Sequence, residues 1–195
     1  MSKQALLRLT RLPLLAVALL TAACDDPFAN PAWSDVPDTV TVFSAYRPEY
    51  AGMASAINLT GNFLSLVAID DLGAATEWDF MLGEDAGNLL WVPSSVVPGR
   101  EDSRSSTARM QETTLEEVRR APEPSGDRYS KEPVVLEEGV VYVLRSRRSN
   151  TCYIRGSNYA KMKVIALDPA LGTAEIAIVR NPYCDNRDLV PPDED

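Results

Sequence analysis

Short runs in which β-branched and aromatic residues alternate with polar residues cover much of the chain after residue 38. Such alternation is typical of half-buried strands, because successive side chains of a strand point to opposite faces of its sheet. Turn-forming residues separate many of the runs and predict antiparallel hairpins, most clearly at residues 168–172. The predicted strands are residues 39–46, 55–59, 63–69, 77–82, 88–92, 134–136, 139–145, 159–167 and 173–179.

The middle of the chain departs from this pattern. Residues 98–111 are polar and contain Gly99, which predicts an exposed loop. Thr113 and Glu116 have capping-box spacing, and they predict a short helix over residues 114–120. Residues 121–131 form a further predicted loop. The whole pattern predicts an all-β fold, a mostly antiparallel sandwich or partly open barrel with one short helix.

The beginning of the chain has the pattern of a bacterial lipoprotein signal. Positive charges precede a short apolar run, residues 12–20, and small residues then lead to Cys24. The run is shorter than the roughly 20 residues that a bilayer-spanning helix needs. We therefore expect residues 1–23 to be removed as a signal peptide and Cys24 to be lipidated. The alternative is an ordinary secretory signal that a cysteine happens to follow.

The rest of the chain divides into a tether, a domain and a tail. Residues 24–38 are rich in proline and acidic residues, which predicts a tether between the acylated cysteine and the domain. Residues 39–190 contain the predicted strands and are expected to form a single β domain. Residues 191–195 form a short acidic tail.

The charge balance limits the partners. Removing residues 1–23 takes away three of the 19 basic residues, which leaves 16 against 28 acidic residues and a formal charge of −12. Such a charge argues against nucleic acid as a partner and against electrostatic adhesion to an anionic membrane. We expect attachment to a membrane through N-terminal acyl chains. The protein is then exported and faces the periplasm or the cell exterior.

Two cysteines, Cys152 and Cys184, remain after lipidation. In an exported protein we expect them to form one disulfide, with two free buried thiols as the alternative. If Asp168 faces Thr173 in the last hairpin, an uninterrupted antiparallel ladder places Ser157 opposite Cys184. The disulfide would then close the open end of that hairpin.

The chain contains no histidine, which removes Ser-His-Asp and Cys-His catalysis and the usual zinc sites. Adjacent acidic residues at 70–71 and 84–85 fall in predicted turns, and neither pair has the spacing of a dedicated calcium loop. A carboxylate pair that acts as in a glycosidase stays open as an alternative. We assign no catalytic residue, no metal ligand and no cofactor, and we expect a non-enzymatic protein.

Two groups of side chains have both a binding and a structural interpretation. Arg145, Arg147, Arg148, Lys161 and Lys163 form a basic cluster in an acidic protein, which indicates either a site for an anionic ligand or partner or a solvated strand face that prevents edge pairing.

Large aromatic residues form the second group. Trp78 and Phe80, with Trp91 across the predicted hairpin, could line an aromatic binding wall. Large aromatic side chains in a small β domain more often fill its core. We expect the core role.

Three short motifs of this chain resemble HmuY-type lipoproteins. They are the glycine-led strand at residues 139–145, the Tyr-Ala-Lys sequence at 159–161 and the Trp-Asp pair at 78–79. The resemblance implies an all-β lipoprotein and, as in some members, capture of haem. Haem ligands in that family are histidines and sometimes methionines, so no histidine ligand carries over. Met81 and Met162 are the residues to examine for haem capture.

The sequence therefore predicts a lipid-anchored lipoprotein of the cell envelope with a non-enzymatic binding or structural role. Its partner is an unknown envelope protein or small ligand. HmuY-like capture of haem or another small ligand is the first alternative, and a carboxylate-dependent enzyme is the second.

Overall fold

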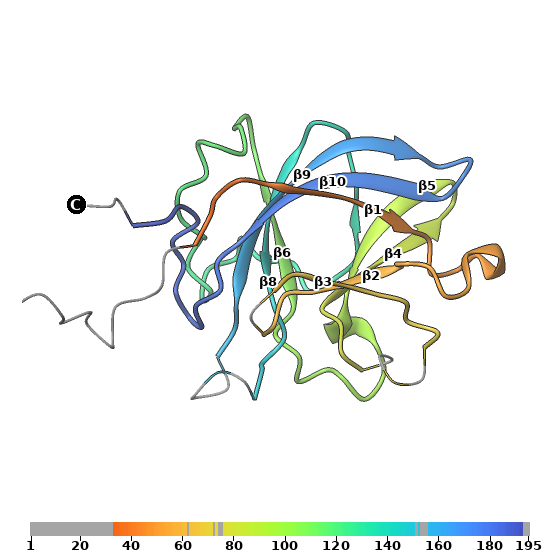
Figure 1. Cartoon of the computed structure of the whole chain (residues 1–195), viewed down its shortest axis with the longest axis horizontal. Coiled ribbons are helices and arrows are strands. Elements are labelled where there is room, and N and C mark those ends of the chain that lie inside the picture. The colour runs from red at the N-terminus through yellow and green to blue at the C-terminus, as the bar shows by residue number, and fades with distance from the viewer. Residues whose placement is uncertain are drawn as a thin grey trace, which may run out of the picture. The chain divides into compact units, whose positions relative to one another are not determined.

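A computed structural model describes residues 33–61, 63–71, 73, 76–150, 152 and 156–192. Among these residues, ten strands form two antiparallel sheets of five strands each (Figure 1). The first sheet has the order β1 (Asp38–Phe43), β10 (Thr173–Arg180), β9 (Tyr159–Asp168), β8 (Val141–Arg145) and β6 (Ser106–Met110). The second has the order β3 (Ser65–Val67), β2 (Ala56–Asn58), β4 (Phe80–Asp85), β5 (Asn88–Pro93) and β7 (Val134–Val135). The all-β prediction is confirmed.

The hairpin of β9 and β10 confirms the predicted turn and its first pair, Asp168 opposite Thr173. A bulge between Glu175 and Ile176 then shifts the register, so that Ile176 faces Val164. The last pair of this ladder is Arg180 and Ala160, so the predicted pair of Ser157 and Cys184 lies beyond its end.

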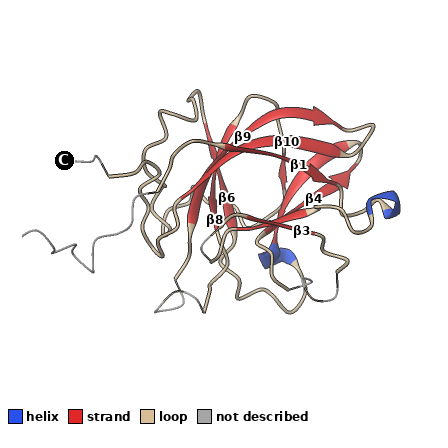
Figure 2. Cartoon of the chain, in the orientation of Figure 1, coloured by secondary structure: helices blue, strands red, loops and turns tan. Residues whose placement is uncertain are grey.

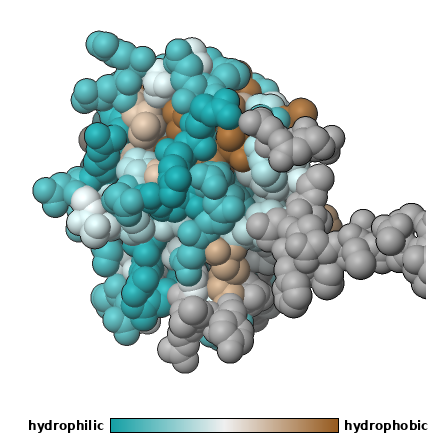
Figure 3. Space-filling view, turned by 90° about the vertical axis from the view of Figure 1, so that its left-hand side faces the viewer, coloured by the Kyte–Doolittle hydropathy of each residue, from teal (hydrophilic) through white to brown (hydrophobic). Residues whose placement is uncertain are grey.

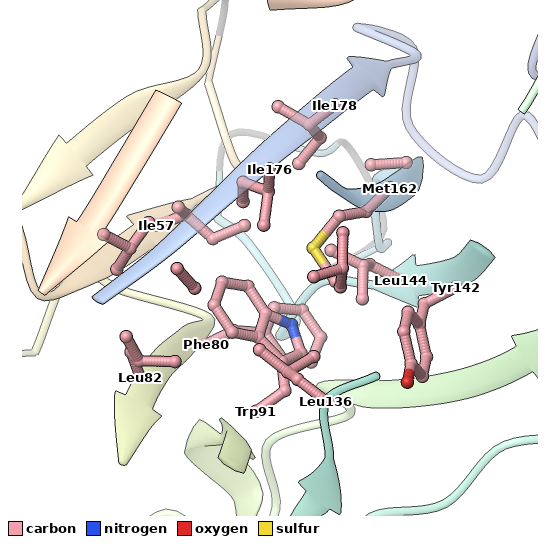
Figure 4. Close-up of a cluster of buried hydrophobic side chains, with 14 of the residues drawn as sticks. Ile57, Phe80, Leu82, Trp91, Leu136, Tyr142, Leu144, Met162, Ile176 and Ile178 are labelled. Carbon is pink, nitrogen blue, oxygen red and sulfur yellow. The ribbon is translucent and has the colours of Figure 1, made fainter. Parts of the chain in front are cut away.

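The main core lies between the two sheets (Figure 4). Alternation within each strand supplies its side chains, such as Tyr142 and Leu144 from β8. Phe80 and Trp91 stack in this core with ring centroids 5.8 Å apart. Both are fully buried, as is Met162 (Figure 4). Core filling is therefore the role of these two aromatic rings.

A second apolar cluster covers the outer face of the first sheet. Leu115, Val118 and Leu189 are among the residues that pack there against Val143 of β8. Backbone hydrogen bonds hold the covering segments, including one of 2.7 Å from the amide of Leu189 to the carbonyl of Arg119. Residues outside the sheets thus complete the domain.

The helix predicted over residues 114–120 is absent, and a turn replaces it. Thr114 and Glu117 form a reciprocal capping box, with the Thr114 amide 2.8 Å from a Glu117 carboxylate oxygen. The chain does not continue as a helix, because the amide of Ala121 bonds to the carbonyl of Arg187 instead. The short helices that the structure does contain in its described part are two 3-10 turns (Figure 2), Pro48–Tyr50 and Ser94–Val96. Neither helix is long and apolar enough to cross a membrane.

The prediction of an exposed loop over residues 98–111 is wrong for its second half, which forms β6. Ser106, Thr107 and Ala108 are buried there. Pairing with β8 satisfies the backbone of this strand, and the amide of Thr107 also bonds to the carbonyl of Ser130. Small hydroxyl residues therefore lie in a buried strand despite their polar appearance in the sequence.

Candidate functional site

Asp79 is fully buried at the entry to β4 and joins the two sheets. One carboxylate oxygen accepts a hydrogen bond of 2.6 Å from the amide of Leu59, just after β2. The other accepts one of 2.7 Å from the amide of Arg147, just after β8. Asp79 therefore fixes two loops that belong to different sheets.

The side chain of Arg147 occupies the space above this carboxylate and is only 12% exposed. Its guanidinium lies 3.2 Å from Asp79 and donates to Asn58, Thr60 and Glu77 at 3.1, 3.1 and 2.6 Å. Burial raises the pKa of Asp79, while the positive charge of Arg147 acts in the opposite direction. Arg147 is thus held rigidly by four neighbours.

Arg100 reaches the same region from the loop before β6. Its guanidinium lies 4.6 Å from the ring centroid of Trp78 and donates to the carbonyls of Thr76 and Trp78 at 2.9 and 3.0 Å. Its Nη1 atom is buried and makes no hydrogen bond to any residue that the structure describes. Burial, followed by the charge of Arg147, lowers the pKa of Arg100. Arg100 is therefore a fixed cation with a spare donor.

A hollow of about 410 Å³ opens beside these two arginines. We call it the arginine hollow, and the described residues that line it are Gly99, Arg100, Asp102, Ser103, Arg147, Arg148 and Asn150. Three of these residues are arginines and one, Asp102, is a carboxylate. Arg148 is exposed. The positive charges thus outnumber the negative charge along this wall.

A triangle of serine hydroxyls supports the side of the hollow. The Oγ atom of Ser103 lies 2.9 Å from that of Ser94 and 2.9 Å from that of Ser105, and the last two are 2.7 Å apart. The Oγ atom of Ser105 also accepts the amide of Ser95 at 3.1 Å. This network fixes the loop that carries Arg100 against the start of β6.

The structure divides the basic cluster that the sequence predicted. Arg147 and Arg148 line the arginine hollow, whereas Arg145, Lys161 and Lys163 belong to β8 and β9. Lys161 is 2% exposed and pairs with Val143 in the ladder, and burial lowers its pKa. Lys161 is therefore not part of a solvated strand face.

Sequence reasoning missed Arg100. It lies 47 residues before Arg147, in a segment whose polarity indicated only a loop. The Trp-Asp pair was the one local signal of this site. Trp78 supplies the ring and a carbonyl for Arg100, and Asp79 binds Arg147.

The predicted disulfide between Cys152 and Cys184 is present, with an S–S distance of 2.00 Å. It connects the segment between β8 and β9 to the segment after β10. The amide of Cys152 bonds to the carbonyl of Ser149, so the bond lies next to the loop that carries Arg148. Cys24 lies outside the described residues.

The acidic residues and methionines that the sequence analysis considered take part in ion pairs, hydrogen bonds or apolar packing. Glu84 pairs with Arg47 at 2.6 Å, and that hydrogen bond lowers the pKa of Glu84. Asp70 accepts the amide of Gly52 at 2.8 Å. Met81 and Met162 are both buried in apolar clusters. Within the described part of the chain, no three potential metal ligands gather in one place.

Comparison with known proteins gives no relative from which a function could be transferred. No family model, no curated protein and no solved structure matches this chain. The functional argument therefore depends on the site alone.

Proposed function

We propose that this chain is a lipid-anchored lipoprotein of the cell envelope whose β domain binds a small anionic ligand without chemical turnover. The anchor is supported by the signal pattern that ends at Cys24. The binding role is supported by one observation above the others, which is that two arginines held in place by other residues, Arg100 and Arg147, line the same hollow.

An anion fits this hollow because its cations are held in place before any ligand arrives. Arg147 is fixed by Asp79 and Glu77, and Arg100 by two carbonyls and a tryptophan ring. Little side-chain entropy is then lost on binding, which favours affinity. Exposed Arg148 and Asn150 can supply further donors. Guanidinium groups bind carboxylate and phosphate oxygens well, so these are the expected ligand groups.

A calorimetric titration of the acylated full-length protein in detergent, with inorganic phosphate and with citrate as probes, tests the binding role. Arg148→Ala removes an exposed guanidinium, and Arg100→Met removes the spare donor but keeps an apolar side chain against Trp78. The control is Arg120→Ala, because Arg120 is an exposed arginine outside the hollow.

We expect saturable binding of at least one probe to the wild type and to Arg120→Ala. A hydrogen bond to a charged group contributes about 1.5–3 kcal/mol, so each hollow variant should lose roughly tenfold or more in affinity. Absence of binding by both probes, or equal affinity in all four proteins, would refute the binding role.

A further inference from the structure

Exposed apolar side chains gather where the described chain begins. Phe63 is 80% exposed and Val36 is 73% exposed, more than any other large apolar side chain in the described part. Both line a groove of about 380 Å³, which we call the apolar groove. Its other described residues are Trp33, Ser34, Asp38, Leu64, Ile178, Val179, Arg180 and Pro182.

This exposure has no explanation in the packing of the domain. Phe63 follows the turn after β2, and its neighbour Leu64 already packs against the main core. The face drawn in Figure 3 is mostly hydrophilic, with hydrophobic residues confined to small areas. Surface apolar residues that line a common groove generally mark a contact surface.

The length of chain between the expected anchor and Trp33 limits how far this end of the domain can lie from the bilayer. Eight residues, 25–32, separate the expected lipidated Cys24 from Trp33. They span at most about 27 Å when fully extended. A domain of this size is about 40 Å across. The end of the domain that carries Trp33 must therefore stay close to the bilayer.

We propose that the apolar groove is the membrane-docking face of the domain, with Phe63, Val36 and Trp33 in contact with the lipid surface. This inference depends on the lipid anchor of the proposed function. Acyl chains fix the chain to the bilayer, and the tether presents this end of the sandwich to it. Burial of apolar side chains at the boundary between headgroups and acyl chains then adds to the attachment.

The residues around the groove suit this role. The one arginine among its described residues, Arg180, donates at 2.8 and 2.6 Å to the carbonyls of Leu59 and Gly61. Arg180 thereby braces the loop that presents Phe63. The same loop offers Thr60 to Arg147 on its other side.

Tryptophan fluorescence tests the proposal without an added label. Trp78 and Trp91 are 4% and 0% exposed, so brominated acyl chains can quench only Trp33 by contact among these three residues. The acylated full-length protein is placed in vesicles of phosphatidylethanolamine and phosphatidylglycerol that contain brominated lipid. We expect a loss of fluorescence that Trp33→Phe abolishes and Phe63→Ser reduces.

Leu171→Ser is the matched control. Leu171 is 56% exposed in the turn between β9 and β10. This turn lies at the opposite end of β10 (Figure 1) from Ile178, Val179 and Arg180, which line the groove. Because Leu171 cannot reach the bilayer together with Phe63, this variant should be quenched like the wild type. Phe63 is itself exposed, so Phe63→Ser should melt at the wild-type temperature.

Flotation of the vesicles distinguishes failure of the docking face from failure of the lipid anchor. If the protein floats with the vesicles but is not quenched, or if Phe63→Ser is quenched like the wild type, the docking face is refuted and the anchor stands. A second copy or the protein's own tether in the groove would give this unquenched result. If the protein does not float, the anchor itself is wrong, and the docking face falls with it.

Discussion

Substitution of Asp79 by asparagine should destabilise the domain strongly, although it hardly changes the size of the side chain. The carboxylate accepts two backbone amides on different oxygens and also faces the Arg147 guanidinium. An asparagine has one oxygen, so its amide group must face either the Leu59 amide or the Arg147 amide. One buried donor is left without a partner, and Arg147 loses its buried counterion.

The magnitude follows from these two losses. A buried unpaired donor costs about 1–3 kcal/mol, and breaking a buried ion pair costs about 3–5 kcal/mol. Because the two losses share the same groups, we expect about 3–5 kcal/mol in total. For a domain of this length, 1 kcal/mol corresponds to about 2–4 °C in Tm. The Tm of Asp79→Asn should therefore fall by about 10–15 °C.

An opposing effect makes this prediction informative. Burial raises the pKa of Asp79, which means that the charged form carries a desolvation cost that asparagine would remove. If that cost outweighed the hydrogen bonds, Asp79→Asn would be neutral or stabilising. Calorimetric melting at pH 7 decides between the two effects. The control is Asp85→Asn, an exposed aspartate of the same strand, which should stay within about 0.5 kcal/mol of the wild type.

A double-mutant cycle with Arg147→Met completes the test. Arg147→Met alone leaves the Asp79 charge buried without its cation, so it should also be costly. The double variant should lose clearly less stability than the sum of the two single losses, because the second substitution removes a group that the first left unpaired. A Tm for Asp79→Asn within about 3 °C of the wild type, or strict additivity in the cycle, would refute the reasoning.

Three further predictions concern the rest of the domain. Removing the disulfide by the double substitution Cys152→Ala and Cys184→Ala should cost about 2–4 kcal/mol, and an unchanged urea midpoint would contradict this. The hydrogen bond from Arg47 lowers the folded-state pKa of Glu84, so the stability that this pair adds is present above about pH 4.3 and is lost as the pH falls through that lowered pKa. Glu84→Gln should therefore lose more stability at pH 7 than at pH 3, and an equal loss at both values would be evidence against it. Burial lowers the pKa of Lys161, so the wild type should gain stability as the pH rises from the lowered pKa toward 10.5, and Lys161→Met should remove that rise. A wild-type stability that falls over this range would exclude the explanation.

The sequence predicted best the strands whose own residues are β-branched, aromatic or otherwise apolar, such as β8, β9 and β10. In β8, successive side chains point in turn to the main core (Tyr142 and Leu144) and to the second apolar cluster (Val141 and Val143). The local run of apolar residues therefore identifies this strand. The turn at 168–172 contains Gly172 with a φ of 67°, a conformation that glycine adopts easily. The pair of Asp168 and Thr173 followed from it. The bulge between Glu175 and Ile176 has no such local signal, and the sequence did not predict it.

The errors share one physical cause, which is contact with residues distant in the sequence. Strand β6 is defined by its pairing with β8, about 35 residues later, and its residues, which include Ser106 and Thr107, gave no apolar alternation. The segment at 114–120 has the capping signal of a helix, but its backbone bonds to residues near 187–189. Arg100 and Arg147 likewise line one hollow although they are 47 residues apart in the sequence, and no sequence pattern predicts that they lie together.

The proposed export, tether and membrane-docking face all depend on the proposed lipid anchor at Cys24, so the chemistry of Cys24 is the most direct test of the account. Intact-mass analysis of the protein extracted from membranes should give a chain that starts at Cys24 and carries acyl groups. Cys24→Ala should keep its signal peptide or leave the membrane fraction. A mature chain that starts elsewhere without acyl groups, or a Cys24→Ala variant processed and fractionated like the wild type, would contradict the account.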